Sequence, residues 1–167
     1  MFVSERTQAA LQELIIECFQ CNRNADRMVS VIGVDMVCPK TSVLLHHHIA
    51  HYFPAVADTI GEKTLERYNI SVKYGATQPP FEISGLSLKG IIAKFEEMCV
   101  DFQSMLMATI KIALENNDIH VYADLLDILE DYNEIVEQII LVRDKVDKYD
   151  DMMAFDHDIE EFWNLGE

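Results

Sequence analysis

The residues best suited to chemistry lie in one segment, HHHIAHYFPAVADTIGEKTLER, which spans residues 46–67. If this segment is helical, offsets of three, four and seven place several polar side chains along one face. That face carries His48, His51, Asp58, Glu62 and either Leu65 or Glu66. Imidazole and carboxylate groups are ligands of iron, manganese and zinc, and a stack of them can bind one ion together with groups on a facing helix. The clustering therefore indicates a metal site, although a single histidine would more often be an ordinary core or surface residue.

A second group of acidic residues lies further along the chain. Its members share one helical face or lie near the edge of that face: Asp124, Asp127, Glu130, Asp131, Glu134 and Glu137. A charged stripe of this kind is usually a solvated helix face. The alternative is the lining of a pore or cavity that attracts metal ions.

Other motifs with a known chemistry are missing from the sequence. It contains no glycine-rich phosphate loop, no nucleophile elbow and no His-Glu-x-x-His pair. It also lacks the Glu-x-x-His motif of di-iron carboxylate bundles. An ordinary di-iron centre built within one chain is therefore not expected. The pair Cys18 and Cys21 could bind metal or cycle redox, but its place in an apolar helical pattern favours packing.

Composition limits what the chain can be. Its 167 residues are 50% hydrophobic, which is enough for one domain with a sizeable core, and only six are glycine and four proline, which favours an all-α fold. The formal net charge of −16 repels a phosphate backbone and disfavours direct DNA binding. Neither a membrane-spanning stretch nor a signal peptide is indicated, and the four cysteines are most simply reduced thiols. We therefore expect a cytoplasmic protein.

Apolar residues at helical spacing predict four long helices, over residues 4–37, 39–74, 87–115 and 119–149. Pro54 is expected to kink the second helix, and the alternative is that a new helix starts there. Residues 74–85 hold two glycines and two prolines and form one long crossover loop. Residues 1–150 are thus interpreted as one helical bundle, and residues 151–167 as an acidic tail with a short amphipathic helix docked on a neighbour.

The run EKTLERYNISVKYGATQPP, residues 62–80, resembles the second helix and following loop of the Dps family of miniferritins. Glu62 matches the first acid of the family's helix, and Glu66 matches the glutamate before Arg67. The resemblance covers most of residues 5–149 and implies a ferritin-like up-down four-helix bundle with one long crossover between its second and third helices.

The resemblance also implies a ferroxidase site shared between two subunits. At the family's spacings, the second of its two site histidines falls on His47, whereas the first falls on Asp35. The tryptophan that commonly follows the first histidine is replaced by Met36. The implied iron ligands are His47, Glu62 and Glu66, followed by Asp35, His48, His51 and Asp58; another divalent metal is the alternative to iron.

The segment ALENNDIHVYADLLDILEDYNEIVEQI, residues 113–139, is similar to the family's acidic turn into its last helix. There the resemblance places Asp118, Asp124 and Asp127 in a threefold pore. It implies a hollow dodecamer that oxidises ferrous iron, stores the ferric product and protects against peroxide. The family's Lys-rich DNA-binding extension has no counterpart in the acidic tail, so DNA binding is not carried over.

Two other functions remain open at this point. One is a ferritin-like bundle without ferroxidase activity that serves as a structural or interaction module, and the change at Asp35 favours it. The other is a different metal-dependent bundle enzyme that uses the HHHIAH cluster for chemistry on a small substrate.

Overall fold

The structure, a computed structural model, describes residues 1–166, which form helices and no strand. Helix α1 spans Glu5–Ser30 and continues into a π-helical turn, Val31–Asp35. Residues 39–68 form a second long helical segment, here called the second rod, which is divided into several short helices. It consists of α2 (Pro39–Leu45), a π-helical turn (His46–Ala50), α3 (Tyr52–Ile60), a second π-helical turn (Gly61–Leu65) and a 3-10 turn (Glu66–Tyr68). The prediction of an all-α chain is confirmed.

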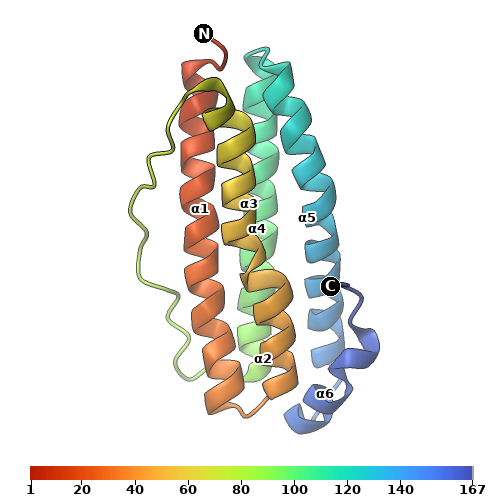
Figure 1. Ribbon diagram of the computed structural model, residues 1–167. Helices are drawn as coiled ribbons and strands as arrows, with labels where there is room; N and C mark the ends of the chain where they lie inside the picture. Colours follow the sequence, from red (N-terminus) through yellow and green to blue (C-terminus); the bar gives the residue numbers. More distant parts are fainter. Residues whose placement is uncertain (167) are drawn as a thin grey trace.

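The second half of the chain contains two long helices and a short one. They are α4 (Leu88–Glu115), α5 (Ile119–Val146) and α6 (Met152–Asp158), followed by a 3-10 turn (Ile159–Phe162). In Figure 1, α1 runs down, α2 and α3 run back up, and residues 69–87 return along the outside of the molecule. Helix α4 then runs up and α5 down, so that α1 packs against α3 and α4, and α4 packs against α5.

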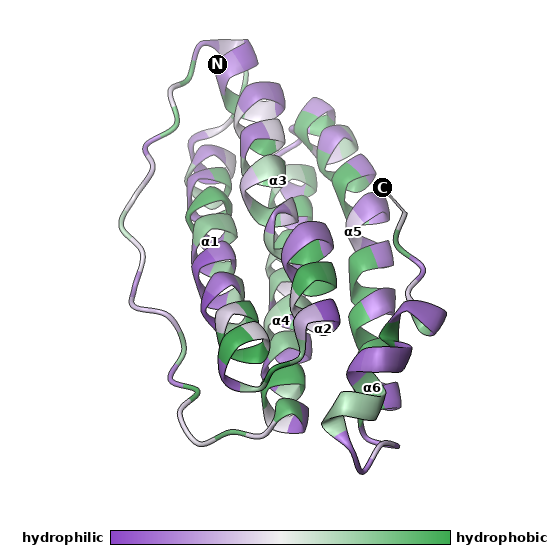
Figure 2. Ribbon diagram, turned by 60° about the horizontal axis from the view of Figure 1, so that its bottom comes forward, coloured by the Kyte–Doolittle hydropathy of each residue, from purple (hydrophilic) through white to green (hydrophobic). Residues whose placement is uncertain are grey.

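The apolar stripes expected from the sequence form the core. Leu11, Leu14, Met28, Phe95 and Phe102 are among the fully buried side chains. The long helices carry hydrophobic and hydrophilic residues on different sides (Figure 2), as amphipathic helices around one core do. Within residues 1–166, every helix is too short or too polar to cross a bilayer.

The segmented second rod shows how the chain accommodates Pro54. Proline has no N–H, so the carbonyl of Ala50, four residues earlier, loses its helical partner. The side chain of Asn22 on α1 takes that place, because its amide nitrogen donates to the Ala50 oxygen at 3.0 Å. The Ala50 carbonyl therefore remains hydrogen-bonded although Pro54 has no N–H to donate. The same bond links α1 to the second rod.

The second rod ends earlier than the sequence predicts. The predicted end at Tyr74 is wrong, because the last helical turn ends at Tyr68. Asn69 adopts a left-handed conformation with φ 61°. Its N–H donates to the Glu66 oxygen, and the N–H of Ile70 donates to the Leu65 oxygen. This pattern is a Schellman motif, which closes a helix through a left-handed residue such as asparagine.

The C-terminal segment is bound to the rest of the molecule through both of its halves. The carboxylate of Asp156 on α6 accepts a hydrogen bond of 2.7 Å from the backbone N–H of Thr41, at the start of α2. Further on, the side chain of Gln138 on α5 accepts from the N–H of Asn164 at 2.6 Å. Residues 151–166 therefore lie against both α2 and α5.

Candidate functional site

Four histidines are grouped on and beside the π-helical turn of the second rod. The ring centroids of His46 and His51 are 4.3 Å apart, those of His47 and His48 are 5.3 Å apart, and those of His47 and His51 are 6.0 Å apart. His47, His48, His51 and Tyr52 line an open hollow on the surface. The histidine cluster is thus brought together in space as well as in sequence.

The C-terminal segment covers one side of this cluster. The ring of Trp163 lies 5.5 Å from the ring of His48, which is half-buried. A neighbouring hollow is lined by His48, Tyr52, Asp131, Glu134, Ile135, Leu165 and Gly166. Burial and the nearby Asp131 carboxylate raise the pKa of Tyr52 above its ordinary range. The spacing within each helix identified the histidines and the acids separately, but their meeting depends on how α5 packs beside the second rod.

The acids predicted on the second rod do not join the histidines. Asp58, Glu62 and Glu66 are exposed, and Glu62 follows His47 by 15 positions. At 1.5 Å per residue that separation is about 22 Å, whereas metal–ligand bonds are about 2 Å long. The expected single face assumed a uniform α-helix, and two π-helical turns change the register of the rod. Among residues 1–166, no three His, Cys, Asp or Glu side chains are gathered to hold one ion.

Asp35 lies apart from the histidines in sequence and ends the π-helical turn after α1, where it is exposed. Two residues further on, Val37 has φ 56°, a left-handed conformation that is rare for a β-branched residue. Asp35, His47, Glu62 and Glu66 are therefore all open to a partner molecule, and none of them points into the core.

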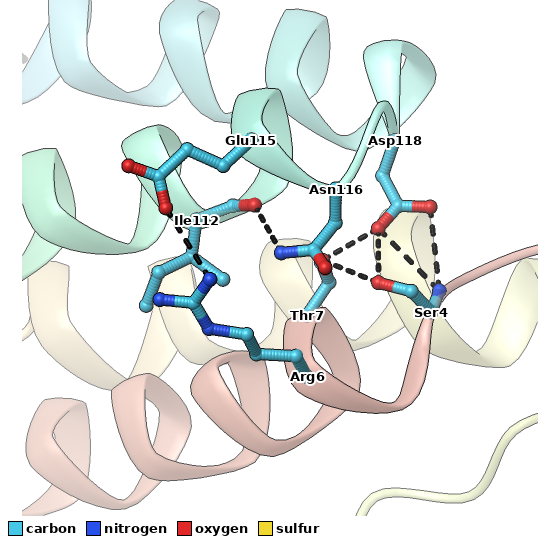
Figure 3. A network of polar contacts seen from close by, with 7 residues as sticks. All are labelled: Ser4, Arg6, Thr7, Ile112, Glu115, Asn116 and Asp118. Carbon is cyan, nitrogen blue, oxygen red and sulfur yellow. Dashed lines mark hydrogen bonds and ion pairs between the residues drawn. The ribbon is translucent and has the colours of Figure 1, made fainter.

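The three candidate pore residues occupy different environments. Asp118 is buried and anchors the start of α1 (Figure 3): its carboxylate accepts hydrogen bonds from the backbone N–H and hydroxyl of Ser4 and from the hydroxyl of Thr7. Asp124 lies 3.7 Å from the guanidinium of Arg67 in an ion pair. Asp127 is exposed.

The environment of Asp118 sets its protonation. Burial acts to raise its pKa, but the hydrogen bonds from Ser4 and Thr7 outweigh burial, so the pKa lies below its ordinary value. Figure 3 shows a second contact across the same junction, where Arg6 pairs with Glu115 at 3.3 Å. Asp118 thus remains charged and satisfied inside the chain.

Aromatic rings pack against one another in the middle of the molecule. Phe53 and Phe102 have ring centroids 5.2 Å apart, and Tyr132 lies 5.0 Å from Phe102. The Tyr132 hydroxyl donates to the backbone oxygen of Cys99. Burial raises the pKa of the Cys99 thiol to about 12. Cys18 and Cys21 are buried free thiols in the same core.

One further carboxylate lies near the core, outside the predicted site residues. Glu17 on α1 has its pKa raised by burial, in spite of a hydrogen bond from Cys21 that lowers it. It lines a surface hollow together with Asp101 of α4 and Gln78 of the long connection. Its signal in the sequence is weak, because Glu17 is a lone acid between the apolar Ile16 and Cys18.

Comparison with known proteins adds no family assignment: no protein-family model matches this chain, and no curated protein sequence matches it.

Proposed function

We propose that this protein is a ferritin-like bundle that assembles with copies of itself and oxidises and stores iron at sites shared between copies. Iron is the substrate and cargo in this proposal. One copy supplies His47, together with Asp35, which takes the place of the family's other site histidine. Another copy supplies Glu62 and Glu66. Two ferrous ions held together at such a site would each give one electron to hydrogen peroxide, which takes up two protons and becomes water.

The observation that carries the proposal is the position of the matching residues on the outside of the molecule. His47, Glu62 and Glu66 are exposed, and about 22 Å of helix separates His47 from Glu62. Residues of one chain at that separation cannot bind the same ion. A second copy that runs antiparallel along the rod would bring its Glu62 next to His47, and by twofold symmetry would form two equal sites.

The path of the chain supports the ferritin-like part of the proposal. Short turns join α1 to α2 and α4 to α5, whereas residues 69–87 run the length of the molecule between α3 and α4. Ferritin-like bundles share one long crossover of this kind. The side chains of Gln12 and Gln20 on α1 hold the connection at Lys73 and Gln78, through hydrogen bonds of 2.9 Å and 2.7 Å.

The charge of the chain suits a protein that collects cations. A net charge of −16 on 167 residues raises the local concentration of ferrous ions. In this proposal, exposed acids such as Asp127 attract the metal, and the histidine and glutamate ligands hold it.

The proposal is tested with a pair of variants matched in charge. Glu62→Gln with Glu66→Gln removes two proposed ligands, and Glu130→Gln with Glu137→Gln removes two exposed acids of α5. We expect the first variant to oxidise ferrous iron with peroxide at least tenfold more slowly than the wild type, and the second to keep the wild-type rate within about twofold. An equal loss of rate in the two variants would show that charge alone, and not a site at Glu62 and Glu66, accounts for the oxidation.

The second candidate is a ferritin-like module that assembles but does not oxidise iron. The residue at position 35 favours it, because the family pattern has a site histidine where this chain has Asp35. The mass of the assembled particle does not separate the two candidate functions, but the oxidation and retention of iron do. Under this alternative, the assembled wild type oxidises ferrous iron no faster than buffer and retains none after gel filtration.

A further inference from the structure

The π-helical turn places two imidazoles where an α-helix would separate them. In an α-helix, residues five apart point about 140° away from each other. Here the N–H of His51 donates to the oxygen of His46 at 3.1 Å, which is the wider bond of a π turn. The two rings accordingly meet edge to face, with centroids 4.3 Å apart.

A carboxylate from the neighbouring helix completes the group. Oδ1 of Asp26 on α1 lies 3.8 Å from Nε2 of His46. Two ligands of one tetrahedral ion with bonds of about 2.1 Å lie about 3.4 Å apart, so the gap between these atoms is close to that required. The side chains of Asp26 and His46 are 50% and 47% exposed, so a dissolved ion can reach them.

We propose that Asp26, His46 and His51 form a binding site for one divalent transition-metal ion of the Zn²⁺ and Co²⁺ type. Two imidazole nitrogens and one carboxylate oxygen are a donor set that such ions accept, with water in the fourth position. Because the three side chains are not yet gathered around one point, the site forms by rotation of the exposed imidazoles about their side-chain bonds. The bound ion then joins α1 to the second rod.

This site does not rest on the proposed iron oxidation, although the resemblance also names His51 among the lesser candidates for iron ligands. It uses neither His47 nor Glu62 nor Glu66, and all of its ligands come from one chain. The proposed Zn²⁺ site therefore does not depend on whether the protein oxidises iron.

The test uses the untagged, metal-free full chain, titrated with Zn²⁺ in a calorimeter and with Co²⁺ under visible absorption. We expect one ion per chain that Glu62→Gln with Glu66→Gln still binds, and an absorption band for Co²⁺ in a low-coordinate site. His46→Gln with His51→Gln should weaken Zn²⁺ binding at least tenfold and abolish the band. Asp26→Asn should weaken binding by a smaller factor, because it keeps the shape of the side chain and removes only the charge.

His157→Gln is the matched control. His157 lies 2.9 Å from the Asp158 carboxylate, so it is also an exposed histidine beside an acid, but no second imidazole contacts it among residues 1–166. This variant should bind Zn²⁺ as the wild type does. Unchanged binding in the folded His46→Gln, His51→Gln variant would overturn the proposal, as would loss of the ion from Glu62→Gln with Glu66→Gln. Circular dichroism confirms the fold of each variant.

Discussion

Asp118 joins the start of α1 to the junction between α4 and α5, through hydrogen bonds from Ser4 and Thr7. Replacing it with alanine leaves a buried hydroxyl unpaired, which costs about 1–3 kcal/mol. We therefore expect Asp118→Ala to lower the free energy of unfolding by that amount at pH 7, as measured by urea denaturation. Asp127→Ala, which removes an exposed acid from α5, is the control and should change stability by less than about 0.5 kcal/mol.

The lowered pKa of Asp118 gives this contribution a pH dependence. Because the folded carboxyl loses its proton more readily than the unfolded one, the contribution is fully present above the ordinary pKa of about 4 and is lost as the pH falls through the lower folded value. The gap between wild type and Asp118→Ala should narrow at acidic pH. A gap that stays constant down to pH 2 would contradict this role for the charge.

The buried thiols make a separate prediction at the same scale. Burial raises the pKa values of Cys18, Cys21 and Cys99, and only the thiolate attacks a disulfide reagent. In the native protein these thiols should react with Ellman's reagent at least about a hundredfold more slowly than in urea. Fast reaction of two or more of the four thiols under native conditions would show that the core opens readily.

The sequence predicted which residues are buried better than it predicted their polar partners. The apolar spacing predicts the long helices, and their apolar residues, such as Leu14, Phe95 and Ile139, are buried in the core, because amphipathic periodicity depends only on local order. The partnership of Ser4 with Asp118 could not be inferred in the same way, since 114 positions separate the two residues. Asp118 was predicted as a pore residue from its position alone, and nothing in the local sequence distinguishes a buried anchor from a pore lining.

At the scale of helices, Pro54 and Asn22 act as a pair. Asn22→Ala should cost about 1–2 kcal/mol, because the Ala50 carbonyl is left without a donor. Pro54→Ala restores an N–H four residues after Ala50, so in that background Asn22→Ala should cost about 1 kcal/mol less. A double-mutant cycle of unfolding free energies measures the difference. Equal costs in the two backgrounds would mean that Asn22 does not replace the missing helical bond.

The order of helices could be predicted from the sequence, but their internal irregularities could not. Glycine and proline mark the long connection, and apolar spacing marks the helices on either side of it. The π-helical turns have no comparable signal, because the run HHHIAH is compatible with either kind of helix. Those turns decide which histidines and acids share a face, so the predicted ligand face was less reliable than the helix that carries it.

At the scale of the whole molecule, the proposed function requires a site that extends beyond one chain. His47 and Glu62 were chosen by resemblance, and the single chain holds them on its surface at opposite ends of the same rod. In the proposed function they meet only through the packing of two copies, which local sequence patterns do not encode.

The most direct test of a shared site is complementation between two inactive variants. His47→Ala removes the histidine, and Glu62→Gln with Glu66→Gln removes the acids. A twofold pair made of one chain of each kind regains one complete site, with His47 from the second variant and both glutamates from the first. Each variant alone should lose at least tenfold in peroxide-driven ferrous oxidation, and mixed assemblies refolded together should recover up to about a quarter of the wild-type rate, since about half of the pairs are mixed and each has one of two sites. Mixed assemblies no more active than the variants alone would contradict a site shared between copies.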